Sequence, residues 1–147
     1  MDFTKDKGKK FKVVYYKKGD INDWVYENPT PASGNKGNNT ALLSVQEIKL
    51  YDKTHKKSIG NVLQHTTSYD TKLKEIITYE ATYFFPDGSI SFDLDFNGQT
   101  TDRKVNVGKY VFKIQGGTGK YLNIEGYVLF EVLPDKNSTR KVKFFTK

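Results

Sequence analysis

The segment from residue 75 to residue 96, EIITYEATYFFPDGSISFDLDF, constrains the fold more than any other part of the chain. Its second half alternates strictly, because single polar residues separate Ile90, Phe92, Leu94 and Phe96. A period of two is typical of a strand with one buried face. The PDGS between the two halves is a strong hairpin signal, since Pro presets φ and Gly accepts positive φ. We therefore predict an antiparallel hairpin here.

Similar short segments recur along the chain, and none of them has a convincing helical period. With the hairpin counted as two, the pattern predicts eight strands, at residues 11–16, 40–52, 57–69, 75–85, 90–96, 104–114, 125–133 and 140–145. Hairpin-length connections favour antiparallel pairing, and closure would remove the exposed edges that invite aggregation. The sequence therefore predicts an all-β fold, an eight-stranded antiparallel β-barrel, with a sandwich as the alternative.

The composition agrees with strands and limits the possible chemistry. Ten Tyr and ten Phe supply much of the apolar content, and aromatic residues are enriched in strands. At 147 residues the chain is expected to form one domain, residues 1–147. The absence of Cys excludes disulfides, thiolate nucleophiles and cysteine zinc sites. We predict neither a metal nor an organic cofactor.

The sequence shows no targeting or membrane-spanning pattern. Residues 1–16 are charged where a secretory signal peptide has an apolar core. No run of about 18 apolar residues is present that could span a bilayer as a helix. We therefore expect an intracellular, soluble protein with no transmembrane segment.

One predicted connection is unusually long. Residues 17–40, KKGDINDWVYENPTPASGNKGNNT, separate the first two predicted strands, and their second half is rich in Pro, Gly, Ser and Asn. Long loops in compact domains are usually functional or mobile. Two interpretations stay open, a surface excursion tethered by Trp24, Val25 and Tyr26, and a lid over a barrel mouth.

Four glycines crowd the segment QGGTGKYLNIEGYVLFEV at residues 115–132. A P-loop needs Gly-x4-Gly-Lys-Ser/Thr between a strand and a helix, whereas here Tyr follows the Lys and the next run is strand-like. A dinucleotide fingerprint would also need a helix after its third glycine. We therefore interpret Gly116, Gly117 and Gly119 as a hairpin reversal, and Gly126 as a bulge or a close contact.

The same segment carries a resemblance to a known family. Residues 116–132 are similar to a Gly-rich pattern near the C-terminus of dirigent proteins and allene oxide cyclases, and residues 79–96 resemble the hairpin before it in the cyclases. Together they cover about the C-terminal half of the chain. The resemblance implies an eight-stranded barrel, often trimeric, whose cavity steers the cyclisation or radical coupling of an apolar substrate. The first-strand carboxylate of the cyclases has no counterpart in FKVVYY at residues 11–16, and the charged cavity residues of dirigent proteins have no match.

Candidate pocket residues come from two neighbouring predicted strands. One strand has a face that presents Tyr79 and Tyr83, and the strand before it has a face with Asn61 and His65. If both faces point inward, the lumen is aromatic with a few polar groups, as small-ligand cavities are. We therefore predict Asn61, Tyr79 and Tyr83 as ligand-binding residues, and His65 as a candidate acid or base. The alternative is that the tyrosines are core residues and that His65 is exposed.

Positive charge concentrates near the two ends of the chain. The formal net charge is +7, and the two clusters contain Lys5, Lys7, Lys9, Lys10, Lys12, Lys17 and Lys18, and Arg140, Lys141, Lys143 and Lys147. In a closed up-and-down barrel the first and last strands are neighbours, so both clusters would form one basic face. Such a face would suit nucleic acid, an acidic protein or an anionic membrane. Solubility combined with coding bias is the alternative, and no specific nucleic-acid motif is present.

Two classes of function stay open at this point. The first is a barrel that binds a small apolar molecule and guides its cyclisation or coupling, as a cofactor-independent isomerase. The second is a non-catalytic homo-oligomeric module, for example a structural or particle-associated component, that uses its outer and basic faces. An open cavity of about 300 Å³ or more beside the candidate residues favours the first, and a lumen filled by Phe and Leu favours the second.

Overall fold

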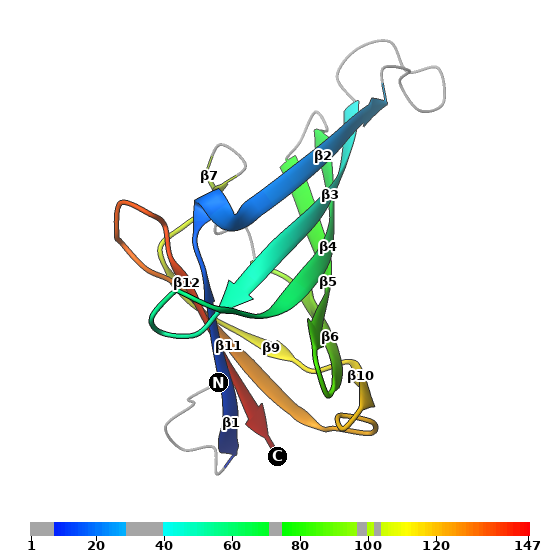
Figure 1. Ribbon diagram of the computed structural model, residues 1–147. Coiled ribbons are helices and arrows are strands. Elements are labelled where there is room, and N and C mark those ends of the chain that lie inside the picture. The colour runs from blue at the N-terminus through cyan, green and yellow to red at the C-terminus, as the bar shows by residue number, and fades with distance from the viewer. Residues whose placement is uncertain (1–7, 29–39, 71–74, 97–99, 102–103) are drawn as a thin grey trace.

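The computed structural model describes residues 8–28, 40–70, 75–96, 100–101 and 104–147 (Figure 1). These residues form strands and one short 3-10 helix, so the predicted all-β class is confirmed. Among the described residues, no helix is long and apolar enough to cross a membrane. The elements are β1 (Lys9–Tyr16), η1 (Lys18–Asp20), β2 (Ile21–Asn28), β3 (Thr40–Tyr51), β4 (Ser58–Asp70), β5 (Glu75–Phe85), β6 (Gly88–Leu94), β7 (Thr100–Thr101), β8 (Lys104–Val105), β9 (Gly108–Lys113), β10 (Gly116–Gly119), β11 (Gly126–Val132) and β12 (Arg140–Thr146).

The main sheet is antiparallel and curls into a half-barrel (Figure 1). Nine strands follow the order β10-β6-β5-β4-β3-β1-β12-β11-β9, β2 joins by pairing with β3, and β7 pairs with β8 separately. The two ends of this path, β9 and β10, are separated along the chain only by Ile114 and Gln115. Ile114 donates a backbone hydrogen bond to Gly126 at 3.0 Å, and Gln115 donates one to Ser91 at 2.8 Å. The predicted count of eight strands is not confirmed.

The first and last strands are neighbours, as the barrel prediction required. β1 pairs with β12 from Lys9↔Thr146 to Tyr16↔Arg140, with a register shift between Lys10 and Lys12. On its other side β1 meets β3 at one pair, Tyr15↔Tyr51. Most of the long strand β3 therefore has a backbone edge that β1 does not cover.

That uncovered edge explains why the predicted loop at residues 17–40 is wrong in its first part. Residues 18–20 form η1, and β2 pairs with β3 from Ile21↔Ile48 to Asn28↔Ala41. Unpaired strand edges expose backbone donors and acceptors, and the preceding segment satisfies those of β3 by adding the strand β2. Residues 29–39 lie outside the described residues, so the lid interpretation stays untested.

The hairpin predicted at residues 75–96 is confirmed. β5 and β6 pair up to Phe85↔Gly88, and the alternating side chains of β6 are buried. Tyr83 and Phe144 anchor an aromatic core, because their rings lie 5.4 Å apart edge to face and Tyr83 stacks on Phe92 at 5.0 Å. Such aromatic pairs stabilise a core beyond the area that they bury.

The glycine-rich segment combines a strand with the reversal that was predicted. Gly116–Gly119 form β10 and pair with β6, and the chain reverses after them with Gly119 in the left-handed region at φ +60°. A Cβ on Gly126 would lie 1.8 Å from the carbonyl oxygen of Phe145. Of the two interpretations of Gly126, a bulge or a close contact, the structure shows the close contact, and its cause is the adjacent strand β12.

Candidate functional site

A cavity of about 650 Å³ lies at one end of the half-barrel, which we call the cavity end. Its wall brings together segments that are far apart in the sequence, from β1 to β12. The lining residues are Tyr16, Lys18, Ile21, Asp23, Gln46, Gln64, Tyr79, Leu94, Phe96, Val105, Phe130, Lys136, Ser138 and Arg140. The volume exceeds the roughly 300 Å³ at which small-molecule sites begin.

A polar row crosses the inner face of three strands in this cavity. Asp23, Gln46 and Gln64 stand directly opposite one another on β2, β3 and β4. Gln64 donates from Nε2 to Oε1 of Gln46 at 2.5 Å, and Thr66 donates to the same oxygen at 2.9 Å. The acceptor of Gln46 is therefore satisfied from within the protein.

The acceptor of Gln64 is different. Gln64 is only 6% exposed, and its Oε1 has no hydrogen-bond partner among the described residues. Leaving a buried polar group unpaired costs about 1–3 kcal/mol of stability. Each such group in a native structure needs a specific explanation, such as a bound molecule that supplies the missing partner. Gln64 is also a lining residue of the cavity, so this buried acceptor lies in the cavity wall.

Aromatic rings form the apolar wall of the cavity. Tyr79 meets Phe96 edge to face at 5.3 Å, and Phe130 lies 5.8 Å from Phe96 and 6.3 Å from Tyr16. Burial raises the pKa of Tyr16 far above its ordinary value, although the nearby Arg140 partly opposes this increase. The ring of Tyr16 is buried in this wall beside Phe130.

Cations surround the mouth of the cavity. Lys18 comes from η1, Lys136 comes from the connection between β11 and β12, and Arg140 begins β12. Nη1 of Arg140 donates to the carbonyl and hydroxyl oxygens of Ser138 at 2.5 and 2.7 Å. The Lys18 N–H donates to the Asn137 carbonyl at 3.1 Å, which holds η1 against this connection.

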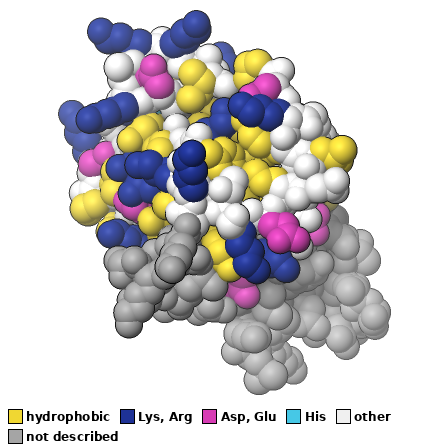
Figure 2. Space-filling model, turned by 90° about the horizontal axis from the view of Figure 1, so that it is seen from below, with side chains coloured by type: hydrophobic (Ala, Val, Ile, Leu, Met, Phe, Trp, Pro, Cys, Tyr) yellow, Lys and Arg dark blue, Asp and Glu magenta, His cyan; other side chains and the backbone are white. Residues whose placement is uncertain are grey.

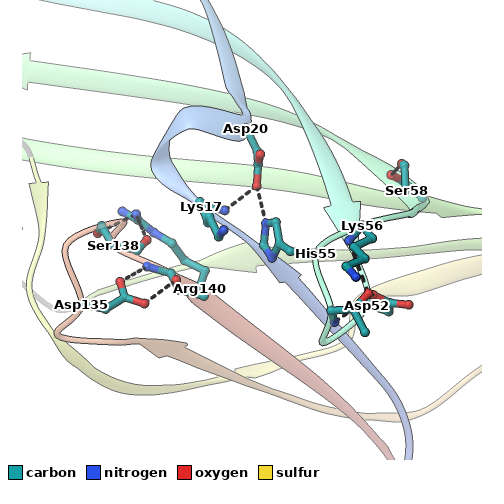
Figure 3. A network of polar contacts seen from close by, with 12 residues as sticks. Lys17, Asp20, Asp52, His55, Lys56, Ser58, Asp135, Ser138 and Arg140 are labelled. Atoms are coloured by element: carbon teal, nitrogen blue, oxygen red, sulfur yellow. Dashed lines mark hydrogen bonds and ion pairs between the residues drawn. The ribbon is translucent and has the colours of Figure 1, made fainter.

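The carboxylates of the neighbouring turns are occupied locally (Figure 3). Asp20 accepts hydrogen bonds from the Lys17 N–H at 2.6 Å and from Nε2 of His55 at 2.9 Å. Asp135 accepts from the backbone and hydroxyl of Thr139 at 2.8 and 2.5 Å, and these bonds lower its pKa. Neither carboxylate belongs to the described cavity lining, where Asp23 is the one acidic residue beside Lys18, Lys136 and Arg140.

The structure separates the four predicted site residues. Tyr79 lines the cavity, and Tyr83 is buried in the core with a hydroxyl that lacks a partner among the described residues. Asn61 and His65 are exposed on the outer face of β4, so they do not share a lumen with the tyrosines. A shift of one residue exchanges the two faces of a strand, and both faces of β4 mix polar with apolar residues. The inward residue is Gln64, which the sequence interpretation missed.

The opposite end of the half-barrel carries another cluster of positive and apolar side chains (Figure 2). A hollow of about 410 Å³ there is lined by Phe11, Lys12, Asp87, Lys120, Tyr121, Leu122, Ile124 and Thr146. Nζ of Lys12 lies 4.2 Å from the ring centroid of Phe85, a cation–π contact. Burial and a hydrogen bond to Asp87 raise the pKa of Tyr121 to about 12. Of the basic clusters, Lys5 and Lys7 lie outside the described residues.

Comparison with known proteins supports the fold. No family model matches the sequence, and no curated protein matches it. A solved structure named pyocyanin demethylase is similar, with a TM-score of 0.56 and 15% identity, over 92% of this chain and 98% of that chain. At this identity the likeness shows a barrel-like fold alone. It does not confirm the resemblance to allene oxide cyclases and dirigent proteins. The described residues contain no group of three His, Cys, Asp or Glu that could hold a metal ion.

Proposed function

We propose that this protein binds a small aromatic molecule in the cavity at the cavity end. The observation that carries the proposal is the cavity of about 650 Å³, whose wall combines aromatic rings with Gln64, a buried side chain whose Oε1 has no hydrogen-bond partner among the described residues. A ligand with a hydroxyl or N–H group would satisfy this acceptor and recover the cost of leaving it unpaired. The phenyl and phenol rings of the wall favour a flat apolar body for the rest of the ligand.

Two further features agree with binding. The cavity reaches about 650 Å³, in the range of sites that enclose small molecules. A protein of similar fold is named for acting on pyocyanin, which is itself a small molecule. A cyclisation or coupling of an apolar substrate, which the resemblance to allene oxide cyclases and dirigent proteins implies, would take place in this cavity. Tyr79 would then contact the substrate, whereas His65 would not.

Naphthol is a suitable probe, because it combines two flat rings with one hydroxyl donor. We expect saturable binding of naphthol to the full chain by isothermal titration calorimetry, and weaker binding of naphthalene. Gln64→Leu should reduce the affinity for naphthol by roughly tenfold, the value of one buried hydrogen bond. It should leave the affinity for naphthalene unchanged or improved.

Asn61→Ala is the matched control, since Asn61 lies on the same strand but on its outer face. Its affinity for naphthol should equal that of the unmodified protein. Equal loss in both variants, or no binding of either probe, would contradict the proposal.

A second candidate function rests on the outer face of the sheet. Large apolar side chains are exposed there on neighbouring strands, with Trp24, Leu43, Leu63 and Phe84 each exposing 42–47%. Exposed apolar patches often mark contacts with other proteins. We propose that a homo-oligomer, a trimer by the resemblance, would use this face as a non-catalytic module. Native mass spectrometry at several protein concentrations tests this proposal. A monomer at every concentration, or an oligomer whose number of chains is unchanged in Leu63→Lys, would exclude it.

A further inference from the structure

The cavity lining contains more positive charge than the binding of a neutral ligand requires. Three cationic side chains and one carboxylate line the cavity, namely Lys18, Lys136 and Arg140 against Asp23. The ion pairs among the described residues are His55–Asp20, Lys120–Asp87 and Lys143–Glu131, and none of them involves these three cations. Unpaired positive charge beside an apolar wall attracts an anion.

Arg140 is the best placed of the three cations. Its two guanidinium hydrogen bonds within the described residues both use Nη1 and both go to Ser138, so the Nε and Nη2 edge is left for another acceptor. That edge has the fork geometry that binds a carboxylate through two parallel hydrogen bonds. The guanidinium carbon also lies 6.0 Å from the ring centroid of Tyr16, beside the aromatic wall.

The backbone around Arg140 is shaped to hold this side chain. Ser138 adopts a left-handed conformation at φ +49°, which is uncommon for a residue other than glycine. Its N–H donates to the Asp135 carbonyl at 3.0 Å, and its own carbonyl and hydroxyl accept from Arg140. Unusual backbone conformations that persist at a cavity often serve to pre-organise a site. The Ser138 turn therefore fixes the guanidinium before any ligand arrives.

Taken together, the cavity has a buried acceptor, an aromatic wall and a pre-organised cationic fork. We propose that the ligand is an aromatic carboxylic acid, whose carboxylate binds Arg140 with help from Lys18 and Lys136 and whose far end donates a hydrogen bond to Gln64. This inference rests on the proposed function, because it assigns the chemical class of ligand to the same cavity. It adds the requirement for a negative charge, which the binding proposal alone does not make.

The test uses the full chain and matched probes that share one ring system. These are a hydroxynaphthoate with its hydroxyl and carboxylate at opposite ends, the methyl ester of that acid, and naphthol. Titration calorimetry should show that the acid binds at least roughly tenfold more tightly than its ester, because a charge-assisted bidentate pair is added. The preference for the acid should fall as salt concentration rises, since the lysines at the mouth are exposed to screening.

Variants separate the cationic fork from the rest of the cavity. Arg140→Gln should abolish the preference for the acid over the ester, and measurable binding of the ester reports that the cavity is intact. Lys136→Gln, on the connection before β12, should reduce the preference for the acid by a smaller factor. It provides a second test of the cationic side chains if the Arg140 variant does not fold. Lys141→Gln is the control, because Lys141 neighbours Arg140 but does not line the cavity.

The outcomes distinguish the two proposals. If the ester and naphthol bind as tightly as the acid in the unmodified protein, the inference about the carboxylate is overturned and the binding proposal stands. If Arg140→Gln and Lys141→Gln reduce the preference for the acid over the ester equally, the role assigned to the Arg140 guanidinium is overturned. If none of the probes binds, the proposed function itself fails.

Discussion

The two ends of the half-barrel place a cation beside aromatic rings in different ways. At the opposite end, Nζ of Lys12 lies 4.2 Å from the Phe85 ring centroid, and Asp87 pairs with Lys120 at 3.7 Å. At the cavity end, Arg140 lies 6.0 Å from the Tyr16 ring, and the ion pairs among described residues do not include it. The first end satisfies its charges from within the protein, whereas the second leaves charges and an acceptor for a ligand.

The glycines show the same difference in packing. At the opposite end a Cβ on Gly126 would lie 1.8 Å from the Phe145 carbonyl oxygen of the adjacent strand β12, and a Cβ on Gly117 would lie 2.3 Å from the Tyr121 carbonyl oxygen of the following turn. The cavity end has the larger cavity, about 650 Å³ against the hollow of about 410 Å³ at the opposite end. Tight packing stabilises the fold, and an open cavity sacrifices packing for binding. We therefore expect the close backbone approach at Gly126 to matter mainly for stability and the lining of the larger cavity to matter mainly for binding.

The largest effect is expected from Gly126→Ala at the tightly packed end. The added methyl would overlap the Phe145 carbonyl, so β11 and β12 would have to separate, and the free energy of unfolding should fall by about 3 kcal/mol or more. Urea denaturation measures this change. Gly116→Ala is the matched control, because nothing lies within 4 Å of its Cβ position, and it should cost much less. Similar losses in the two variants would contradict the assignment of Gly126 to close packing.

Gln64→Leu should have a smaller effect of opposite sign. Replacing a buried amide that has an unpaired acceptor with an apolar side chain of similar size should raise the free energy of unfolding by about 1 kcal/mol. Thr66 continues to bond Gln46 in this variant, so that acceptor stays satisfied. Urea denaturation of the ligand-free protein checks the expectation. A protein that is clearly less stable would mean that Gln64 is needed for folding, and the comparison of the two ends would lose its main support.

Acid should weaken the turn beside the cavity. Hydrogen bonds from the Thr139 hydroxyl and backbone lower the pKa of Asp135 from its ordinary 3.8. A lowered pKa in the folded state contributes stability above pH 3.8, and this contribution is lost as the pH falls through the lowered pKa. Asp135→Asn should therefore flatten the decline of the urea midpoint between about pH 5 and pH 2. Asp93→Asn, at an exposed position on β6, is the control, and an equal flattening there would refute a specific role for Asp135.

The smallest effect is expected from His65→Ala. His65 is exposed on the outer face of β4, away from the cavity lining, so its removal should change the free energy of unfolding by less than about 0.5 kcal/mol. The affinity for naphthol should also stay unchanged by titration calorimetry. A loss of binding would restore His65 as a site residue and would show that ligands contact the outer face.

Local patterns predicted the β5–β6 hairpin well, and they failed on the face of β4. In β6 the alternation is strict, so Phe92 and its apolar neighbours identify the inner face without ambiguity. In β4 both faces carry polar and apolar residues, and only pairing with β3 places Gln64 against Gln46 inside the cavity. β2 was missed for a related reason, because its strand partner becomes available only when β3 extends beyond β1.

Local patterns in the sequence predicted the all-β class, the β5–β6 hairpin and the pairing of the first strand with the last, and they gave a close approach as one of two interpretations of Gly126. These properties follow from periods of two, from turn residues and from the need of strands to pair, all of which act over short stretches or over simple topology. The residues of the cavity come together only in the folded protein. Gln64 and Arg140 are separated by more than half the chain, and they share one cavity because the curled sheet brings β4 and β12 to the same end. A pattern in one strand cannot specify which distant side chains will face it across a cavity, since that depends on the register and curvature of every strand between them.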